Sequence, residues 1–361
     1  MADDTQLLAP TSDWTEPGIF EVLPGVHRIP LPLVGDALRA VNVYALIADD
    51  RLTLIDSGYG RNSLTHEALG KALAQIGRSL GDIDQFLITH MHSDHYTFAV
   101  EMRRELSTLI RLGAGEEPNM QEAARKEHPR PSPLGKRLII AGASELQERD
   151  ADSRRQQTPW EMPDSWMQDG EKIQIGETTL DVIATPGHTR GHVVFADRQR
   201  SVIFSGDHVL PHITPSIGYE PAPTKSPLAD YLLSLMVIRG MPDAQMFPAH
   251  GAPGQSIHKR VDELLAHHEY RLEQTLDVVK RADCSALQAA EQLRWTRREH
   301  HFNTLDLLNQ MLAVNETMAH LDVLASRGTI TRLLISGVAH YTAEPTRVRI
   351  TSTKKSGDGN V

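Results

Sequence analysis

The chain has 361 residues, of which 40% are hydrophobic, and a formal net charge of -10 at pH 7. This length allows a large hydrophobic core and a smaller second unit. The acidic balance argues against wholesale electrostatic binding to nucleic acid or to an anionic membrane, because both need an excess of Lys and Arg. The single cysteine, Cys284, excludes an intramolecular disulfide framework. Residues 1–6 show no secretory signal pattern and no apolar run is long enough for a membrane span, so a cytoplasmic protein is predicted.

Residues 1–18 are polar and interrupted by Pro and Gly, which predicts a flexible leader. Short apolar runs separated by turn formers then predict strands at 19–22, 26–29, 41–47 and 52–55. A helical pattern at 63–77 and a buried strand at 86–88 follow. Strand, helix and strand in this order indicate an α/β layer.

Residues 113–170 are rich in proline and charge, and we interpret them as an insertion beside the site, a lid or a wall for the substrate. Strand patterns return at 180–184, 193–196, 202–205 and 245–247. Each of these runs ends near a His or an Asp. Because sites in layered α/β folds are built on strand ends and the loops after them, these positions are candidates for chemistry.

The pattern after residue 254 is helical. It predicts helices at 257–282, at 285–294 with Asp283 as N-cap, and at 305–326 with Gly328 as the stop. A β-hairpin at 329–334 and 338–342 is predicted around Ser336 and Gly337. These elements favour a winged-helix-like domain at 256–343, after a first domain at 19–255, with a disordered tail at 344–361.

The strongest chemical signal is the run from Thr89 to His95, in which three imidazoles and one carboxylate fall within six positions directly after a buried strand. In an extended or turn conformation His90 and His92 project to the same side. Asp94 and His95 can then reach a second point a few ångströms away. One short loop can thus serve two metal ions, and this density disfavours the alternative of a polar surface loop with incidental histidines.

Three further segments follow predicted strands and carry residue types that bind metals. Residues 186–192 contain His188 and His192, residues 205–208 contain Asp207 and His208, and residues 248–251 contain His250. Each segment alone is ordinary turn chemistry. Together and in this order they are a specific pattern.

This pattern resembles the metallo-beta-lactamase superfamily over residues 20–255, with His-x-His-x-Asp-His as its signature. The resemblance implies an α/β fold, a four-layer αββα sandwich, here followed by the helical winged-helix-like domain. It also implies two divalent metal ions. The residues it assigns are His90, His92 and His188 at the first ion, Asp94, His95 and His250 at the second, Asp207 as the bridge, and Asp56 as a support of the ligand loop.

Imidazole and carboxylate ligands without thiolate suit zinc, while iron and manganese stay open. Two divalent ions that share one water supply a metal-bound hydroxide at neutral pH and polarise the oxygen that is attacked. Asp94 can orient that hydroxide and accept its proton. His192 is a supporting or substrate-facing candidate. The candidates for substrate contact are His208, His212, Tyr219, Arg190 and Lys225, and a purely structural role is an open alternative for each.

We expect hydrolysis of a small acyl substrate, a thioester, an ester or a lactone. The alternative is an RNA or phosphodiester nuclease with the same metals, because residues 256–343 resemble the beta-lactamase-like protein 2 group, which includes a mitochondrial endoribonuclease. A third alternative is a winged-helix regulator that only senses ligand. The helix at 305–326 has few cations and is a poor phosphate reader, so nucleic acid is not expected as a partner, and a homodimer contact stays open.

Overall fold

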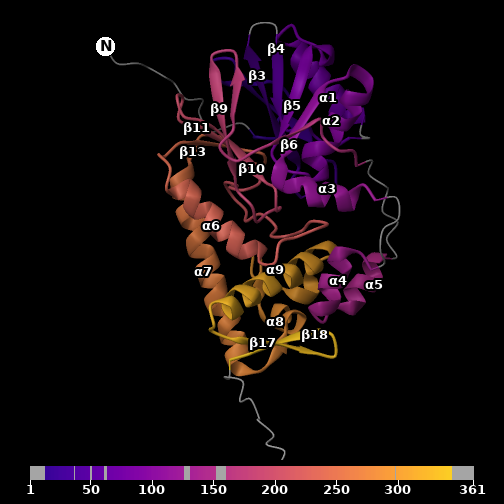
Figure 1. Cartoon of the computed structure of the whole chain (residues 1–361), viewed down its shortest axis with the longest axis vertical. Helices are drawn as coiled ribbons and strands as arrows, with labels where there is room; N and C mark the ends of the chain where they lie inside the picture. Colours follow the sequence, from indigo (N-terminus) through magenta and orange to yellow (C-terminus); the bar gives the residue numbers. More distant parts are fainter. Residues whose placement is uncertain are drawn as a thin grey trace, which may run out of the picture.

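The computed structural model of the chain describes residues 13–35, 37–48, 51–60, 63–125, 131–151, 160–296 and 298–343 (Figure 1). Most of the predicted leader, residues 1–12, and the whole predicted tail, residues 344–361, lie outside the described residues. The described part contains two large sheets and a set of C-terminal helices. No helix in this part combines the length and the apolar character that a membrane span requires.

The first sheet has seven strands in the order β1-β2-β3-β4-β5-β6-β7. The pairs from β1 to β4 are antiparallel and those from β4 to β7 are parallel. Its strands are β1 (Phe20–Leu23), β2 (Val26–Pro32), β3 (Ala40–Ala48), β4 (Arg51–Ile55), β5 (Ile83–Ile88), β6 (Leu109–Gly113) and β7 (Ser165–Met167). The structure confirms the predicted strands in β1 to β5, while β6 and β7 were not predicted.

Helices α1 (Ser63–Ala74) and α2 (Ser93–Leu106) cover the outer face of this sheet. Their apolar side chains, such as Leu69, Leu73 and Phe98, share one buried cluster with the strand residues Leu54 and Phe86. Helix α1 was predicted. Helix α2 was not, because its first turn carries the polar residues of the ligand signature and therefore lacks an apolar period at its start.

The second sheet has six strands in the order β13-β12-β11-β10-β9-β8, antiparallel except for the parallel pair of β11 and β12. Its strands are β8 (Lys172–Ile175), β9 (Thr178–Ala184), β10 (Val193–Asp197), β11 (Val202–Gly206), β12 (Gln245–Pro248) and β13 (Gln255–Ser256). Helices α6 (Pro227–Arg239) and α7 (Ile257–Arg281) share a buried cluster with its outer face, where Ile203 and Met246 join Leu235 and Leu264.

The two sheets pack face to face around three aromatic rings. Tyr44 on β3 lies 5.2 Å from Phe204 on β11 and 5.5 Å from Phe247 on β12, measured between ring centroids. All three side chains are buried, and the buried residues around them come from both sheets. Helices, sheet, sheet and helices therefore form four layers, which confirms the predicted αββα sandwich.

The segment at 113–170 is more regular than its composition suggests. It contains a 3-10 turn at Ala114–Glu116, then α3 (Glu117–Ala123), α4 (Pro133–Ile140) and α5 (Ser144–Ala151). Helices α4 and α5 pack against α9 (Leu307–Ser326) of the C-terminal part, and Figure 1 shows these three helices below the sandwich. Two of the three helices thus belong to the same core as the C-terminal helices.

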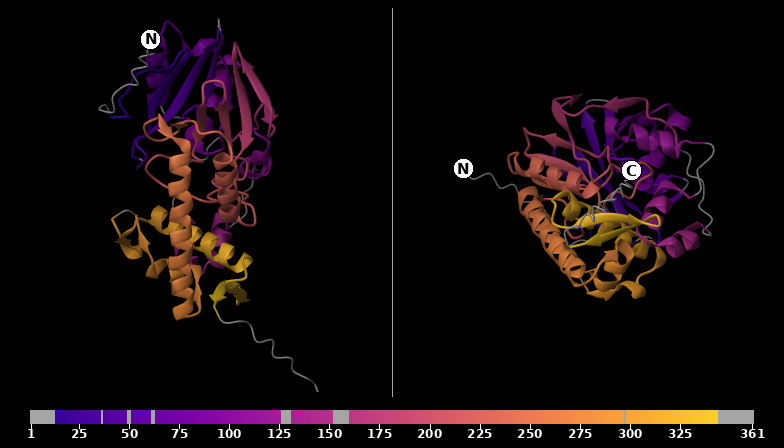
Figure 2. Two further views of the ribbon diagram at one scale, coloured as in Figure 1. Left: turned by 90° about the vertical axis from the view of Figure 1, so that its left-hand side faces the viewer. Right: turned by 60° about the horizontal axis from the view of Figure 1, so that its bottom comes forward.

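The C-terminal part begins with α7, which runs from the second sheet down into the lower helices (Figure 2). Its other elements are β14 (Cys284–Ser285), α8 (Ala286–Gln292), β15 (Arg294–Trp295), β16 (His300–His301), a 3-10 turn at Phe302–Thr304, α9, β17 (Thr331–Ile335) and β18 (Val338–Thr342). Strands β14, β18 and β17 form a three-stranded sheet. The predicted hairpin is therefore confirmed as β17 and β18.

The predicted N-cap Asp283 is wrong. Ser285 caps α8 instead, because its Oγ accepts a hydrogen bond from Gln288 N while Gln288 Oε1 accepts one from Ser285 N. This reciprocal pair is a capping box, and it satisfies two backbone donors at once. The capping-box pattern Ser-x-x-Gln is present in the sequence at 285–288 and is the more specific signal for the cap.

We predict that Phe204→Ala lowers the free energy of unfolding by about 3–5 kcal/mol, because it empties a fully buried site between the sheets. The matched control is Leu308→Ala on α9, where the side chain is 48% exposed, and it should change stability by less than about 0.5 kcal/mol. Denaturant titration of the two variants measures both values. Equal losses in the two variants would contradict the inter-sheet core described above.

Candidate metal centre

The first group of ligand atoms joins three imidazoles at the ends of β5 and β9. His90 Nε2 lies 3.1 Å from His92 Nδ1 and 3.2 Å from His188 Nε2, and the last two atoms are 2.9 Å apart. Asp207, directly after β11, places Oδ2 3.5 Å from His188 Nε2 and 4.0 Å from His90 Nε2. Four donors from three separate segments therefore converge on one point.

The second group joins Asp94 and His95, in the first turn of α2, with His250 after β12. Asp94 Oδ2 lies 3.5 Å from both His95 Nε2 and His250 Nε2. Asp207 Oδ1 lies 3.7 Å from His95 Nε2 and 3.4 Å from His250 Nε2. Asp207 thus turns one carboxylate oxygen to each group, which is the arrangement of a bridging ligand.

The helical start of α2 separates the two groups. His92 is the N-cap of α2, so His90 and His92 lie in the extended segment before the helix and Asp94 and His95 lie within it. We had expected the whole run to be one loop. The change from extended to helical backbone turns Asp94 and His95 toward a point different from that of His90 and His92, and this explains how one short segment serves both groups.

The outward nitrogen of each imidazole has a partner that fixes the ring. His188 Nδ1 contacts Ser216 O at 2.7 Å, His250 Nδ1 contacts Ala40 O at 2.7 Å, and His92 Nε2 contacts Tyr219 O at 2.9 Å. His90 Nδ1 lies 3.0 Å from Thr89 Oγ1. A backbone carbonyl can only accept, so it selects the tautomer that leaves the inward nitrogen free to bind a metal ion.

Asp56 holds the ligand segment from behind. This buried carboxylate accepts hydrogen bonds from Thr89 N at 2.8 Å and from Thr89 Oγ1 at 3.0 Å, and its Oδ2 lies 2.9 Å from His95 Nδ1. Its backbone has φ 61°, an uncommon value for a residue with a side chain. These contacts agree with the supporting role that the sequence resemblance implies for Asp56.

His192 supports Asp207 through the backbone. Its Nε2 accepts a hydrogen bond from Asp207 N at 3.1 Å, and its Nδ1 contacts Thr185 Oγ1 at 2.9 Å. Gly206 is needed beside it, because a Cβ there would lie 2.7 Å from His192 Nε2 and φ is +50°. Both ring nitrogens of His192 are therefore occupied, which favours the supporting role over contact with substrate.

Buried ligand atoms without hydrogen-bond partners indicate, independently of the family resemblance, that the two groups can hold divalent metal ions. His95 Nε2, His250 Nε2 and Asp207 Oδ1 are buried and have no hydrogen-bond partner among the described residues. Such atoms are costly unless a ligand satisfies them. The three imidazole nitrogens of the first group lie 2.9–3.2 Å apart. Tetrahedral zinc with Zn–N distances of about 2.0–2.1 Å needs nitrogens about 3.3 Å apart.

The pKa shifts of the ligands differ between the groups. Burial, and then the neighbouring histidines, hold the pKa of His90 and of His188 well below its usual range. Burial opposes the charged form of His95 as well, but Asp94, Asp56 and Asp207 outweigh it and raise the pKa of His95 well above its usual range. Asp207 and Asp94 likewise outweigh burial and raise the pKa of His250.

The candidates for substrate contact lie in different places. His208 is fully buried and its ring lies 5.2 Å from that of Tyr231, so we do not propose it as a substrate contact. Tyr219 is partly buried and its ring lies 6.3 Å from that of His92. Arg190 turns NH1 to Ala222 O at 3.0 Å. Lys225 is exposed.

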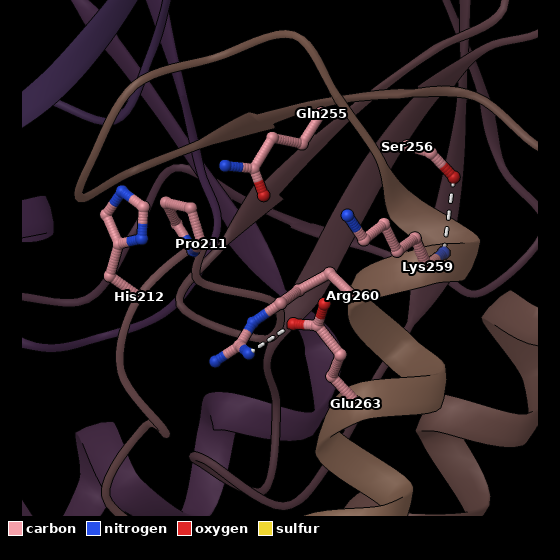
Figure 3. A pocket seen from close by; sticks show the side chains of 7 residues that line it. All are labelled: Pro211, His212, Gln255, Ser256, Lys259, Arg260 and Glu263. Atoms are coloured by element: carbon pink, nitrogen blue, oxygen red, sulfur yellow. Dashed lines mark hydrogen bonds and ion pairs between the residues drawn. The ribbon is translucent and has the colours of Figure 1, made fainter. Parts of the chain in front are cut away.

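His212 lies at a separate pocket of about 470 Å³ between the loop after β11 and the first turns of α7 (Figure 3). The pocket is lined by Pro211, His212, Gln255, Ser256, Lys259, Arg260 and Glu263. Pro211 packs tightly against Gly251, the residue after His250, so one lining residue of the pocket contacts the segment that carries this ligand residue. The charge of Arg260 is paired with Glu263 at 2.8 Å.

The sequence did not point to a buried acidic cluster behind the first group. Glu116 Oε1 accepts hydrogen bonds from Met91 N and Thr189 Oγ1, and Asn119 donates through Nδ2 to both Glu116 and Glu220. Burial raises the pKa of Glu116 and raises that of Glu220 to about 8. The sequence provided no separate signal for this cluster, because Glu116 lies in the segment at 113–170 that was interpreted only as an insertion.

The loop after Asp207 is fastened from the C-terminal helices. Arg260 on α7 donates to Leu210 O at 2.6 Å and to Ile213 O at 3.0 Å. Asn315 on α9 donates to Ile217 O at 2.7 Å. This loop carries the Ser216 and Tyr219 carbonyls that contact His188 and His92, so α7 and α9 contribute indirectly to the first group.

We predict that Asp207→Ala weakens binding of both metal ions by more than about 100-fold, because it removes the one side chain shared by the two groups. Metal analysis after extensive dialysis measures the loss, and circular dichroism checks that the variant is folded. The control is Cys284→Ser, which changes a buried residue outside both groups and should retain metal and activity. Two ions retained in Asp207→Ala, or none in Cys284→Ser, would refute the ligand assignment.

We also predict that, as the pH is lowered, the second group loses its metal ion at a higher pH than the first group does. A raised pKa means that His95 and His250 keep their protons to higher pH, so protons compete there while His90 and His188 are still neutral. Equilibrium dialysis against buffered zinc between about pH 5 and pH 8 should show two separate steps. His250→Ala should remove the step at higher pH, and loss of both ions in one step would contradict the prediction.

Comparison with known proteins agrees with this geometry. The family model for the metallo-beta-lactamase superfamily matches residues 36–250. The lactamase-like protein adaB of Aspergillus niger is 27% identical over 245 residues, which are 68% of this chain but only 60% of that protein. The probable metallo-hydrolase YqjP of Bacillus subtilis is 26% identical, over 84% of this chain and 92% of that protein. An atrochrysone carboxyl ACP thioesterase of Paecilomyces divaricatus is 23% identical, over 73% of this chain and 68% of that protein.

A solved structure extends the likeness through the C-terminal helices. The crystal structure of a metallo-beta-lactamase family protein from Thermus thermophilus has a TM-score of 0.69 and 26% identity, and the match covers 90% of this chain and 100% of that one. The family model alone covers more than half of the chain. This chain therefore belongs to the metallo-beta-lactamase superfamily.

Proposed function

We propose that the chain hydrolyses the carbonyl group of a small acyl substrate, a thioester, an ester or a lactone. The observation that supports this most is the convergence of five imidazoles and two carboxylates into two groups joined by Asp207. Two divalent cations bound there, with zinc the best match to these donors, would supply a water of lowered pKa and polarise the substrate carbonyl.

Asp94 is the residue that we assign to proton transfer. Its side chain is 19% exposed, whereas those of His90 and His95 are fully buried, so Asp94 faces the open side of the centre. Its Oδ2 also belongs to the second group. A carboxylate in this position can orient the attacking water, accept its proton and pass that proton to the leaving group.

Tyr219 is the best placed of the candidates for substrate contact. Its carbonyl fixes His92, and its partly buried ring lies beside that imidazole on the loop after Asp207. A phenol ring so close to the first group can pack against an acyl chain and donate a hydrogen bond. Arg190, which donates a hydrogen bond to Ala222 O, and His212, which lies at the separate pocket, are less direct candidates for substrate contact.

Two observations favour an acyl substrate over a phosphodiester. The chain has a formal net charge of -10 at pH 7, which opposes the binding of a polyanion such as RNA. One relative is named as a thioesterase of a carboxyl ACP substrate. Both fit a thioester or another neutral carbonyl compound.

A nuclease is the second candidate function, because the C-terminal part has a winged-helix-like order of elements. Helices α8 and α9 followed by the β17–β18 hairpin support the assignment of 256–343 as a winged-helix-like domain after the domain at 19–255. Yet α9 turns Asn315 inward to Ile217, and 12 of its 20 residues are buried. We therefore propose that this helix is a packing element and not a reader of phosphates.

The test is a hydrolysis screen with the zinc-loaded protein. The substrates are acyl-CoA and acyl carrier protein thioesters, glutathione thioesters, lactones and aryl esters, beside bis(p-nitrophenyl) phosphate and single-stranded RNA. We expect turnover of carbonyl substrates, and we expect His90→Ala to abolish it with loss of metal. Asp94→Asn should lower kcat by about 100-fold or more, because a general base typically contributes 10²–10⁴.

The controls separate chemistry from folding. His301→Ala changes an exposed histidine far from both groups in the sequence and should leave turnover unchanged. Cleavage of RNA or of the phosphodiester alone would replace the acyl hydrolase by the nuclease. A protein that binds no metal and hydrolyses nothing would overturn both.

A further inference from the structure

Glu116 touches both loops that supply the histidines of the first group. Its Oε1 accepts a hydrogen bond from Met91 N at 3.3 Å, and Met91 lies between His90 and His92. The same oxygen accepts one from Thr189 Oγ1, and Thr189 follows His188. One carboxylate thus joins the segment after β5 to the segment after β9, which come from different sheets.

The backbone around Glu116 leaves it little freedom to move. A Cβ on Gly191 would lie 2.0 Å from Glu116 N, and a Cβ on Gly115 would lie 2.7 Å from Gly191 Cα. The two segments therefore touch backbone to backbone, which only glycines permit at this distance. The carboxylate of Glu116 is fixed relative to the ligand loop at 188–192.

Asn119 and Glu220 back Glu116 on its other side. Asn119 donates to Glu116 Oε2 and to Glu220 Oε2, and its Oδ1 accepts from Ala222 N at 2.8 Å. Glu220 in turn accepts from Arg190 N at 2.7 Å. The network therefore contacts the neighbours of all three histidines, because Met91 lies between His90 and His92 and Thr189 follows His188. It also includes Glu220, the residue after Tyr219, whose carbonyl contacts His92.

The charge of Glu116 needs an explanation. The side chain is fully buried, and none of the ion pairs in the described part of the chain includes it. Burial raises the pKa of Glu116, because a buried carboxylate without a nearby cation is costly, and a cation bound at the first group would favour the carboxylate form. Three imidazoles bring no negative charge to the first group, and Asp207 is shared with the second, so a divalent cation there would be incompletely neutralised by its own ligands.

We propose that Glu116 is a positioning residue for the first metal ion, which holds the loops of His90, His92 and His188 in register and supplies negative charge to offset that ion. This inference rests on the proposed metal centre. It does not depend on which substrate is hydrolysed. It gives the acidic cluster a role that is separate from metal ligation and from the proton transfer by Asp94.

The experiment compares Glu116→Gln with Glu117→Gln. Glu117 is the next residue, is exposed and accepts a hydrogen bond from Gln121 Nε2 at 3.2 Å, so it is a matched control for the loss of one carboxylate. Zinc affinity is measured by competition with a chromophoric chelator. We expect one of the two ions to bind about 10–100-fold more weakly in Glu116→Gln, as for other outer partners of metal ligands, and no change in Glu117→Gln.

A purely structural role is distinguished by the melting temperature with and without zinc. If Glu116 only packs, Glu116→Gln melts lower without zinc and binds both ions with unchanged affinity, and the proposal is wrong. Thr189→Val is the second variant in case Glu116→Gln does not fold, because it removes one hydroxyl anchor and keeps the carboxylate. It should weaken the same ion, but less than tenfold, and an unchanged affinity in that variant would also overturn the proposal.

The outcome for the wild-type protein separates this inference from the proposed function. Wild-type protein that binds no zinc removes the metal centre itself, and with it the proposed function. Wild-type protein that binds two ions, with Glu116→Gln equal to it in both affinities, removes only the role of Glu116. Substitution with cobalt adds a spectroscopic signature, since a distorted first site would change the d–d absorption in Glu116→Gln but not in Glu117→Gln.

Discussion

The metal centre depends on the packing between the two sheets, because each ligand group takes residues from both. His90 and His92 follow β5 of the first sheet, whereas His188 and Asp207 follow β9 and β11 of the second. Tyr44 sits at this junction: its ring packs on Phe204 and Phe247, and its hydroxyl donates to Pro248 O at 2.9 Å, two residues before His250. A shift of one sheet against the other by an ångström would separate ligands that must lie about 3 Å apart. The inter-sheet core therefore sets the precision of the site as well as the stability of the fold.

The outward nitrogens of the five ligand histidines all have partners, whereas the inward nitrogens of the second group have no hydrogen-bond partner among the described residues. Backbone carbonyls or hydroxyls hold the outward nitrogens of His90, His92, His188 and His250, and the carboxylate of Asp56 holds that of His95. The inward atoms without a partner in the described part of the chain are His95 Nε2, His250 Nε2 and Asp207 Oδ1. Rings that are fixed before the ligand arrives lose little entropy when it binds. The arrangement therefore favours binding of a cation, and the carboxylates behind the ligand residues help to offset the charge of that cation.

The sequence predicted most strands of the sandwich and placed the seven proposed ligand residues in segments that follow strands, because apolar runs and the spacing of the signature are local features. It failed where the outcome depends on partners. Helix α6 packs one face against the rest of the fold but also has apolar residues on its exposed face (Leu233, Met236 and Val237), so it shows no helical period. The inverted use of His92, with Nδ1 inward, depends on the carbonyl of Tyr219, which is 127 positions away along the chain. Glu116 is recognisable only once Met91 and Thr189 are seen beside it.

The C-terminal helices are part of the same argument, since they determine the shape of the loop after Asp207. Arg260 holds Leu210 O and Ile213 O, and Asn315 holds Ile217 O while accepting from Arg137 on α4. A carbonyl buried in this loop must find a donor, and α7 and α9 provide it. The neighbouring carbonyls of Ser216 and Tyr219 are thereby directed to His188 and His92. Removing these helices would leave three loop carbonyls without donors and two ligand rings without fixed partners, so the sandwich and the C-terminal part form one functional unit in which the second orders the first.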